Sequence, residues 1–220
     1  DRSEEAVAAY EAMLTRDPDN PELHAYFNSY LGVIRHPDYL RSYDEALERY
    51  PGDARFAVPL ARRHLLENRG QDALHVLETA LSKGGESASL KRELSHVLRE
   101  QGEFEQALEH ARSAVNANST PASESELATA VMAAGVDYQE AQALLTSLVK
   151  RFPVDQGLWA LYATALRYTD NATAYSSLVD YDTVIQVRKI TCQQDYATLE
   201  DFLDVIRQSL LSLHITKQHP

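Results

Sequence analysis

A repeat of 34 residues is the feature that most constrains the fold of this chain. Two series of small or apolar residues recur in phase at this spacing: Ala73, Ala107 and Ala141, and Ala46, Ala80, Ala114 and Leu148. Pro51 and Pro153 are separated by 102 residues, which is three such periods. A fixed period in this range is typical of a helical solenoid, in which each repeat contacts only its neighbours.

Residues 100–108 show what one period contains. They predict the end of a helix, a tight turn at Gly102 and the start of a second helix that carries Ala107. Two antiparallel helices approach closely only where a side chain is short, so we expect Ala73, Ala107 and Ala141 at the helix crossings. The predicted repeat array covers residues 1–175, with units at 1–20 (partial), 21–53, 54–87, 88–121, 122–155 and 156–175 (partial).

Residues 176–220 do not follow the period. The stretch 181–192 is rich in β-branched residues, which favour an extended conformation. Residues 196–214 predict a strongly amphipathic helix with an apolar stripe. That stripe comprises Tyr196, Leu199, Phe202, Leu203, Ile206, Leu210 and Leu213. We expect this helix either to cap the array or to pack on another domain.

The repeated positions resemble the tetratricopeptide repeat (TPR) family. The matching positions are Gly102-x-Phe104 with Ala107 and Ala114, Tyr138 with Ala141 and Pro153, and Trp159 with Tyr162-Ala163. The first-helix glycine of the family is replaced by Ala61, Ser95, Thr129 and Ala163, and the unit between Pro18 and Pro51 has 33 residues. The resemblance implies an all-α, right-handed superhelical α-solenoid with a C-terminal capping helix, and a role in protein–protein recognition.

The C-terminal region carries a second, shorter resemblance. Residues 178–182, the extended stretch after them and residues 210–214 are similar to the region that precedes a 2-oxoglutarate/Fe(II)-dependent oxygenase domain in TPR-containing bacterial proteins. The chain begins at Asp1, within a helical pattern, which indicates a piece of a longer protein. This resemblance implies a parent oxygenase whose catalytic domain follows Pro220.

Composition excludes several partner classes. The net charge is −12 and the pI is about 5.1, which argues against nucleic acid and against anionic membrane surfaces as partners. No run of about 18 apolar residues is present to span a bilayer. Cys192 is the single cysteine, so a disulfide framework is excluded, and a reducing, cytoplasmic location is expected.

Three short patterns could suggest chemistry, and each has a simpler interpretation. His36-Pro37-Asp38 fits an iron-binding His-x-Asp motif and also the tripeptide of J-domains, but no strands or basic helical hairpin accompany it. Glu93-x-x-His96 is one half of a di-iron motif without its second copy. Cys192 has no evident histidine partner. We therefore predict no catalytic residue, cofactor or metal, and no enzymatic activity in this part of the protein.

The candidate site is the concave groove that the first helices line in TPR arrays. The register places seven residues there: His24, Asn28, Arg55, Arg62, Arg92, His96 and Arg99. A row of guanidinium groups suits the carboxylates of an acidic peptide or of a neighbouring domain of the same chain. The alternative is a solvated face in which these residues pair with Glu93 and Glu100. The chaperone-binding carboxylate clamp is not matched, because Ser89 and Glu93 stand where it needs basic residues.

Three functions remain open at this point. The first is a scaffold that binds a peptide or partner domain in the groove. The second is a substrate-presenting region of an oxygenase, for which an His-x-Asp…His set after Pro220 would be the test. The third is a structural module that self-associates through the ends of the solenoid, which light scattering of the purified chain would detect.

Overall fold

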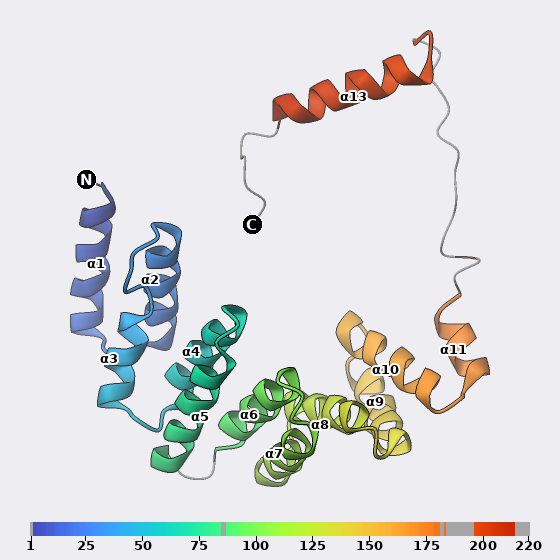
Figure 1. Cartoon of the computed structure of the whole chain (residues 1–220), viewed down its shortest axis with the longest axis horizontal. Helices are drawn as coiled ribbons and strands as arrows, with labels where there is room; N and C mark the ends of the chain where they lie inside the picture. Colours follow the sequence, from blue (N-terminus) through green and yellow to red (C-terminus); the bar gives the residue numbers. More distant parts are fainter. Residues whose placement is uncertain (1, 85–86, 181–182, 184–195, 214–220) are drawn as a thin grey trace. The chain divides into compact units, whose positions relative to one another are not determined.

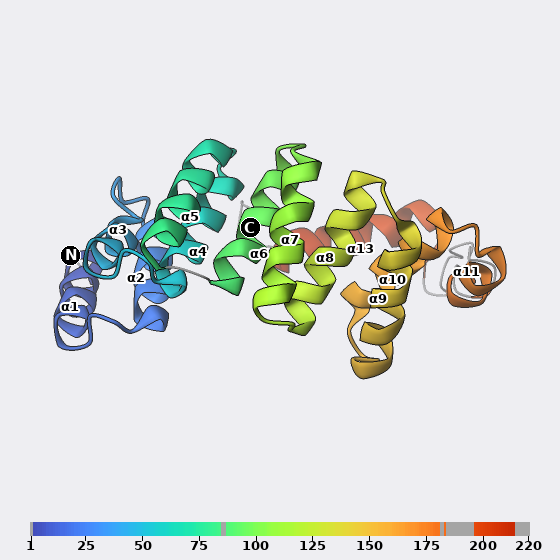
Figure 2. The same cartoon turned by 90° about the horizontal axis from the view of Figure 1, so that it is seen from below.

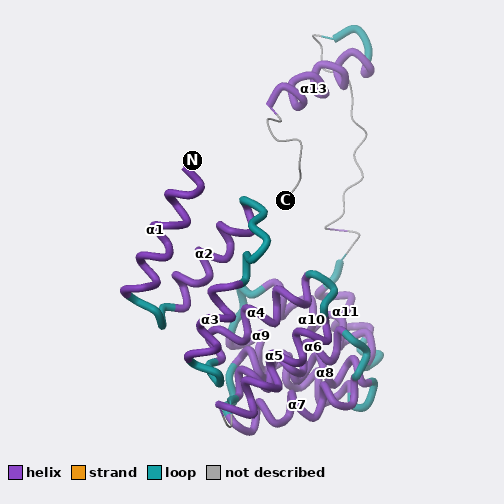
Figure 3. Tube along the Cα trace, turned by 60° about the vertical axis from the view of Figure 1, so that its left-hand side comes forward, coloured by secondary structure: helices purple, strands orange, loops and turns teal. Residues whose placement is uncertain are grey.

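The computed structural model describes residues 2–84, 87–180, 183 and 196–213. These residues form twelve helices and no strand (Figures 1 and 3), which confirms the predicted all-α repeat fold. The chain divides into two compact units, Asp1–Leu178 and Val179–Pro220. The predicted extended stretch 181–192 lies outside the described residues, apart from Thr183.

The first unit is a series of helical hairpins. Its helices are α1 (Arg2–Arg16), α2 (Pro21–Val33), α3 (Arg41–Arg49), α4 (Ala54–Leu66), α5 (Gly70–Gly84), α6 (Ala88–Glu100), α7 (Phe104–Ala117), α8 (Pro121–Ala134), α9 (Tyr138–Arg151), α10 (Gln156–Tyr168) and α11 (Ala172–Leu178). Each helix packs on the next along the chain, and the first helices of successive hairpins, α2, α4, α6, α8 and α10, also contact one another (Figure 2). These first helices therefore form a continuous face.

Each first helix begins at a polar residue that caps it. The capping residues are Asn20, Asp53, Ser87, Thr120 and Asp155, and each side chain accepts a hydrogen bond from a backbone N–H of the first turn. Such a cap satisfies one of the four N–H groups that have no partner within the helix. The caps recur at intervals of 33 to 35 residues, so the local signal for helix initiation repeats with the hairpin.

The turn inside each hairpin needs a left-handed residue. Gly102 has a φ of 82° and Gly135 a φ of 67°. In the other hairpins the left-handed residue is not glycine, and these residues are Arg35, Asn68 and Asp170. A left-handed conformation ends a helix because the chain leaves the helical path while its last carbonyls still find partners. Glycine adopts it without the strain that a Cβ causes.

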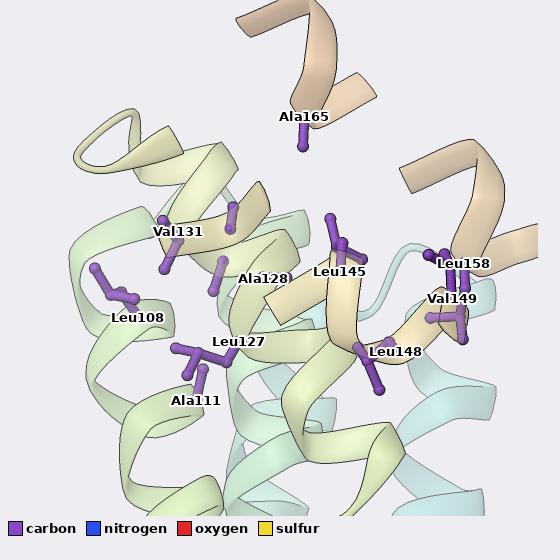
Figure 4. Close-up of a cluster of buried hydrophobic side chains, with 12 residues drawn as sticks. Leu108, Ala111, Leu127, Ala128, Val131, Leu145, Leu148, Val149, Leu158 and Ala165 are labelled. Carbon is purple, nitrogen blue, oxygen red and sulfur yellow. The ribbon is translucent and has the colours of Figure 1, made fainter. Parts of the chain in front are cut away.

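The alanines that define the period are fully buried. Ala73, Ala107 and Ala141 each have 0% exposure, and the second series is equally inaccessible. A cluster of buried apolar side chains from α7, α8, α9 and α10 combines short residues such as Ala111 and Ala128 with longer ones (Figure 4). Leu127, Leu145 and Leu148 are among its longer members. Short and long side chains are thus buried together between neighbouring helices.

The described part of the second unit contains one long helix. It is α13 (Leu199–Leu213), which lies within the predicted span 196–214. Thr198 and Asp201 form reciprocal hydrogen bonds at its start, in the manner of a capping box. Several apolar residues of its predicted stripe are exposed, including Leu203, Ile206 and Leu210.

Candidate binding surface on the first helices

A hollow of about 400 Å³ lies on the face formed by α4, α6 and α8. Its lining comprises Arg62, Arg92, Glu93, His96, Ala122, Ser125 and Glu126. Three of the seven predicted groove residues, Arg62, Arg92 and His96, therefore lie together in it. Two arginines and two glutamates oppose one another in this lining, so the surface is of mixed charge rather than purely basic.

Arg62 is held by a buried carboxylate from the next hairpin. Its Nε donates to Glu93 Oε1 and its Nη2 to Glu93 Oε2, both at 2.7 Å. The Glu93 side chain is 1% exposed, whereas that of Arg62 is 55% exposed. The hydrogen bonds to Glu93 raise the pKa of Arg62 above its ordinary value, so the guanidinium stays charged. A bidentate pair of this kind fixes the orientation of the arginine as well as its charge.

Arg99 is also occupied. Its Nη1 donates to Glu100 Oε1 at 2.8 Å, and its Nη2 lies 2.7 Å from His96 Nδ1, which accepts because a guanidinium can only donate. Its Nε reaches Glu126 Oε1 at 3.5 Å, and the Ser95 hydroxyl donates to the same oxygen at 2.9 Å. The pairing with Glu93 and Glu100 that the sequence left open is thus present for Arg62 and Arg99.

Arg92 differs from its neighbours. It is half-buried and lines the hollow, and among the described residues it has no ion pair or hydrogen-bond partner. Arg55 lies away from the hollow and bonds to Asp53, the cap of its own helix, at 2.7 to 3.1 Å. That bond lowers the pKa of Asp53 below its ordinary value. Of the four arginines in the predicted row, Arg92 is therefore the one without an ion-pair or hydrogen-bond partner among the described residues.

The structure places His24 and Asn28 in the interior, at 3% and 4% exposure. The His24 ring packs near Tyr43 and Phe56, and its Nε2 lies 3.0 Å from the carbonyl oxygen of Pro18. Both residues are buried because the unit that contains them has 33 residues rather than 34. This difference shifts α2 by one residue position relative to the later first helices. One residue turns a helical face by about 100°, so the surface positions here fall on Ala25 and Ser29.

A second hollow, of about 280 Å³, lies on α2, α3 and α4. It is lined by Ala25, Asn28, Ser29, Leu40, Tyr43, Pro59, Arg62, Arg63 and Leu66. Arg62 lines both hollows, so the two are neighbours on the same face. Burial raises the pKa of the Tyr43 phenol, while Asn28 and Arg63 act in the opposite direction, so this group carries its proton at neutral pH.

The sequence analysis named Glu93 only as an alternative ion-pair partner, and it did not name Glu126 as a hydrogen-bond acceptor. Both accept from a residue 31 positions earlier, Glu93 from Arg62 and Glu126 from Ser95. In both cases a polar residue on one first helix donates a hydrogen bond to a glutamate on the next first helix. The recurrence of a polar residue and a glutamate 31 positions apart could therefore have predicted these contacts from the sequence. Elsewhere, His36-Pro37-Asp38 forms the turn after α2, where the Asp38 N–H donates to His36 Nδ1 at 3.1 Å.

Two other kinds of site are absent from the described residues. No group of three or more His, Cys, Asp or Glu side chains there is arranged to hold a metal ion. None of the described helices combines the length and the apolar character needed to cross a bilayer.

Stacked helical hairpins with a continuous first-helix face define the class of this protein as a helical-repeat solenoid. Residues 58–123 match the family model of the tetratricopeptide repeat. This stretch is therefore similar to tetratricopeptide repeats, and proteins of that family generally mediate protein–protein interactions. No curated protein matches the sequence.

Solved structures show the same fold at low sequence identity. PilW, a type IV pilus biogenesis factor, is 20% identical with a TM-score of 0.63, over 83% of this chain and 86% of that one. A TPR protein from Parabacteroides merdae is 16% identical with a TM-score of 0.59, over 83% and 73%. YrrB, a TPR protein with an unusual peptide-binding site, is 17% identical with a TM-score of 0.55, over 96% and 98%.

Proposed function

We propose that this protein binds a protein or peptide partner on the face formed by α4, α6 and α8. The hollow there is the docking site, and Arg92 binds a carboxylate of the partner. The observation that carries this proposal is that the Arg92 guanidinium has no ion pair or hydrogen-bond partner among the described residues. A partner with one acidic residue at this point, rather than an acidic run, matches a lining of two arginines and two glutamates.

Charge and geometry support a single acidic contact. Arg62 and Arg99 already donate to glutamates of the protein, so a second carboxylate near either would face a like charge. No described residue accepts a hydrogen bond from Arg92, so its guanidinium can donate to a partner carboxylate in a bidentate bond. The neighbouring surface of α8 carries two small, partly exposed residues, Ala133 and Ala134, against which apolar groups of a partner can lie, whereas Ala130 is fully buried.

The test uses labelled peptides and fluorescence anisotropy. A pool of random peptides with one glutamate at a fixed position is compared with the same pool carrying glutamine there. We expect the glutamate pool to bind more tightly, and Arg92→Ala to remove the difference. The expected loss is about tenfold in affinity, as for a partly exposed hydrogen bond to a charged group.

Arg112→Ala is the matched control. Arg112 is also partly exposed but lies on α7, where it bonds to Glu140 at 3.0 Å. This variant should bind both pools as the unmodified protein does. Equal binding of the two pools, or equal losses in the two variants, would overturn the role of Arg92. Arg92 is preferable to Arg62 or Arg99 for this test, because substituting either of those leaves a glutamate of the protein without its partner.

A further inference from the structure

A third hollow, of about 330 Å³, lies on α3 and α5, the second helices of adjacent hairpins. Its lining comprises Asp44, Leu47, Glu48, Pro51, Leu60, His75, Val76, Thr79 and Ala80. The floor is apolar, because Leu60 and Ala80 are each 1% exposed. Asp44 and Glu48, by contrast, are exposed carboxylates that belong to the α3 side of the hollow. The hollow therefore combines an apolar floor with a negatively charged edge.

The two carboxylates of this edge lie close together. Asp44 and Glu48 are four residues apart on α3, so their Cβ atoms are about 5–6 Å apart on one helical face. Neither carboxylate has an ion-pair or hydrogen-bond partner in the part of the chain that the structure describes. Partial burial raises the pKa of Asp44, and so does the charge of Glu48. His64 and Arg69 act in the opposite direction, but Arg69 is already bonded to Asp72 at 2.7 Å.

Two other pairs of second helices are joined by ion pairs. Arg41 of α3 bonds to Glu11 of α1, and Arg112 of α7 bonds to Glu140 of α9. Arg41 lines a separate hollow on the α1 side of α3, together with Arg49, so neither arginine belongs to the lining on α3 and α5. The acidic edge is thus complementary to a group that brings its own positive charge.

We infer that the hollow on α3 and α5 binds a lysine side chain of a partner protein. The four methylene groups of lysine can lie along the apolar floor while the ammonium reaches the carboxylates. Its three N–H donors can be shared between Asp44 and Glu48, whereas the planar guanidinium of arginine is matched to a single carboxylate. The volume of about 330 Å³ admits one side chain of this length. The net charge of −12 also favours the approach of a basic partner.

The test uses three small probes and nuclear magnetic resonance of the ¹⁵N-labelled protein. Nα-acetyl-lysine N-methylamide, its ε-acetylated form and the arginine analogue are titrated separately. We expect the lysine probe to shift the backbone amide signals of Val76 and Thr79, with a dissociation constant on the order of millimolar for so small a ligand. The ε-acetylated probe should bind at least about fivefold more weakly, because it keeps the stem but lacks the charge. The arginine analogue should bind more weakly than the lysine probe.

The double variant Asp44→Asn, Glu48→Gln is decisive, since it removes both charges and nearly keeps the shape of the side chains. It should lose the preference for the lysine probe over the ε-acetylated one. The matched control is Glu105→Gln, Glu109→Gln, because these glutamates form an exposed pair four residues apart on α7 and lie outside the hollow. This control removes the same charge and should keep the preference.

Thr79→Tyr tests the shape of the hollow, because Thr79 is exposed and lines it. The larger side chain should fill the hollow and weaken the binding of the lysine probe. All the altered side chains are exposed, so each variant should keep the fold.

Four results would overturn the inference. Equal binding of the lysine and ε-acetylated probes would exclude a role for the charge, and equal losses in the two double variants would show that net charge alone attracts the probe. Unchanged binding in Thr79→Tyr would place the probe elsewhere, and tighter binding of the arginine analogue would contradict the choice of lysine. Arg92→Ala should leave the lysine probe bound, which separates this result from the test of the α4–α6–α8 hollow.

Discussion

Replacing Arg62 with methionine tests the energetic role of the buried carboxylate on the first-helix face. Methionine keeps an unbranched, flexible side chain but removes the guanidinium. The Glu93 carboxylate, which is 1% exposed and accepts two hydrogen bonds of 2.7 Å from Arg62, then has lost its charged partner. The variant should therefore be less stable, even though the residue that is changed lies largely at the surface.

The expected loss follows from the burial of the two partners. Removing one member of a fully buried ion pair costs about 3–5 kcal/mol. The Arg62 side chain is 55% exposed, so water can reach Glu93 in the variant, and we expect about 2–3 kcal/mol instead. Arg112→Met provides the matched control, since Arg112 is 51% exposed but its partner Glu140 is 32% exposed. Exposed pairs contribute about 0–1 kcal/mol.

Urea unfolding followed by circular dichroism at neutral pH is the assay. The free energies of unfolding of the unmodified protein, Arg62→Met and Arg112→Met are compared under the same conditions. Arg62→Met should show the larger deficit, because its carboxylate partner Glu93 is 1% exposed whereas Glu140 is 32% exposed.

Two results would refute this reasoning. Equal losses for Arg62→Met and Arg112→Met would show that the burial of Glu93 does not set the cost. A double variant Arg62→Met, Glu93→Leu that is no more stable than Arg62→Met would show that the carboxylate is not the group left without a partner. The double variant Arg62→Met, Glu93→Leu should recover most of the loss, because both charges are then absent.

Three further predictions concern stability. Burial, and to a smaller extent the charge of Arg69, lowers the pKa of His64 below the unfolded value of about 6.5. The stabilisation that the neutral His64 provides is therefore present above about pH 6.5 and is lost as the pH falls through the folded pKa. His64→Leu should flatten the decline of the urea midpoint below about pH 6.5, because the titrating imidazole is removed. The fold should accept leucine there, since Leu98 occupies the equivalent position of the next repeat. An unchanged decline would contradict this. Arg35→Gly should relieve the strain of φ 56° and stabilise by about 0.5–1 kcal/mol in thermal unfolding, whereas a lower melting temperature would argue against strain there. Ala107→Leu should cost about 1–3 kcal/mol by overpacking a fully buried crossing, while Glu105→Leu on the exposed side of α7 should cost little.

The fold was predictable because its determinants are local and repeated. The alanine positions, the polar caps and the residues of the turns depend on the chain within one hairpin, and each recurs about every 34 residues. Nearest-neighbour packing then builds the array, since a repeat contacts only the repeats beside it. Ala107 and Gly102 could thus be assigned their structural roles before any coordinates were considered.

The candidate site was predictable only in part. Arg62, Arg92 and His96 do lie together on one hollow, because the 34-residue register holds from α4 onward. His24 and Asn28 lie inside, because the shorter unit before α4 turns α2 by one residue position relative to that register. An offset of one residue turns a surface position of the helix into a buried one. The 34-residue period alone does not show which positions of α2 are buried.

The sequence by itself determined the solenoid, its period and the helices that form its faces, because these follow from backbone chemistry and from short side chains at fixed spacing. Only the tertiary structure decided which charges remain available. Ion pairs depend on side chains about 30 residues apart that meet across adjacent helices, and on how deeply each partner is buried. Arg62 and Arg99 each reach a glutamate of the next first helix, and Arg55 pairs with Asp53 of its own helix start. Arg92 is therefore the arginine of the predicted row to test for recognition, since no described residue pairs with it.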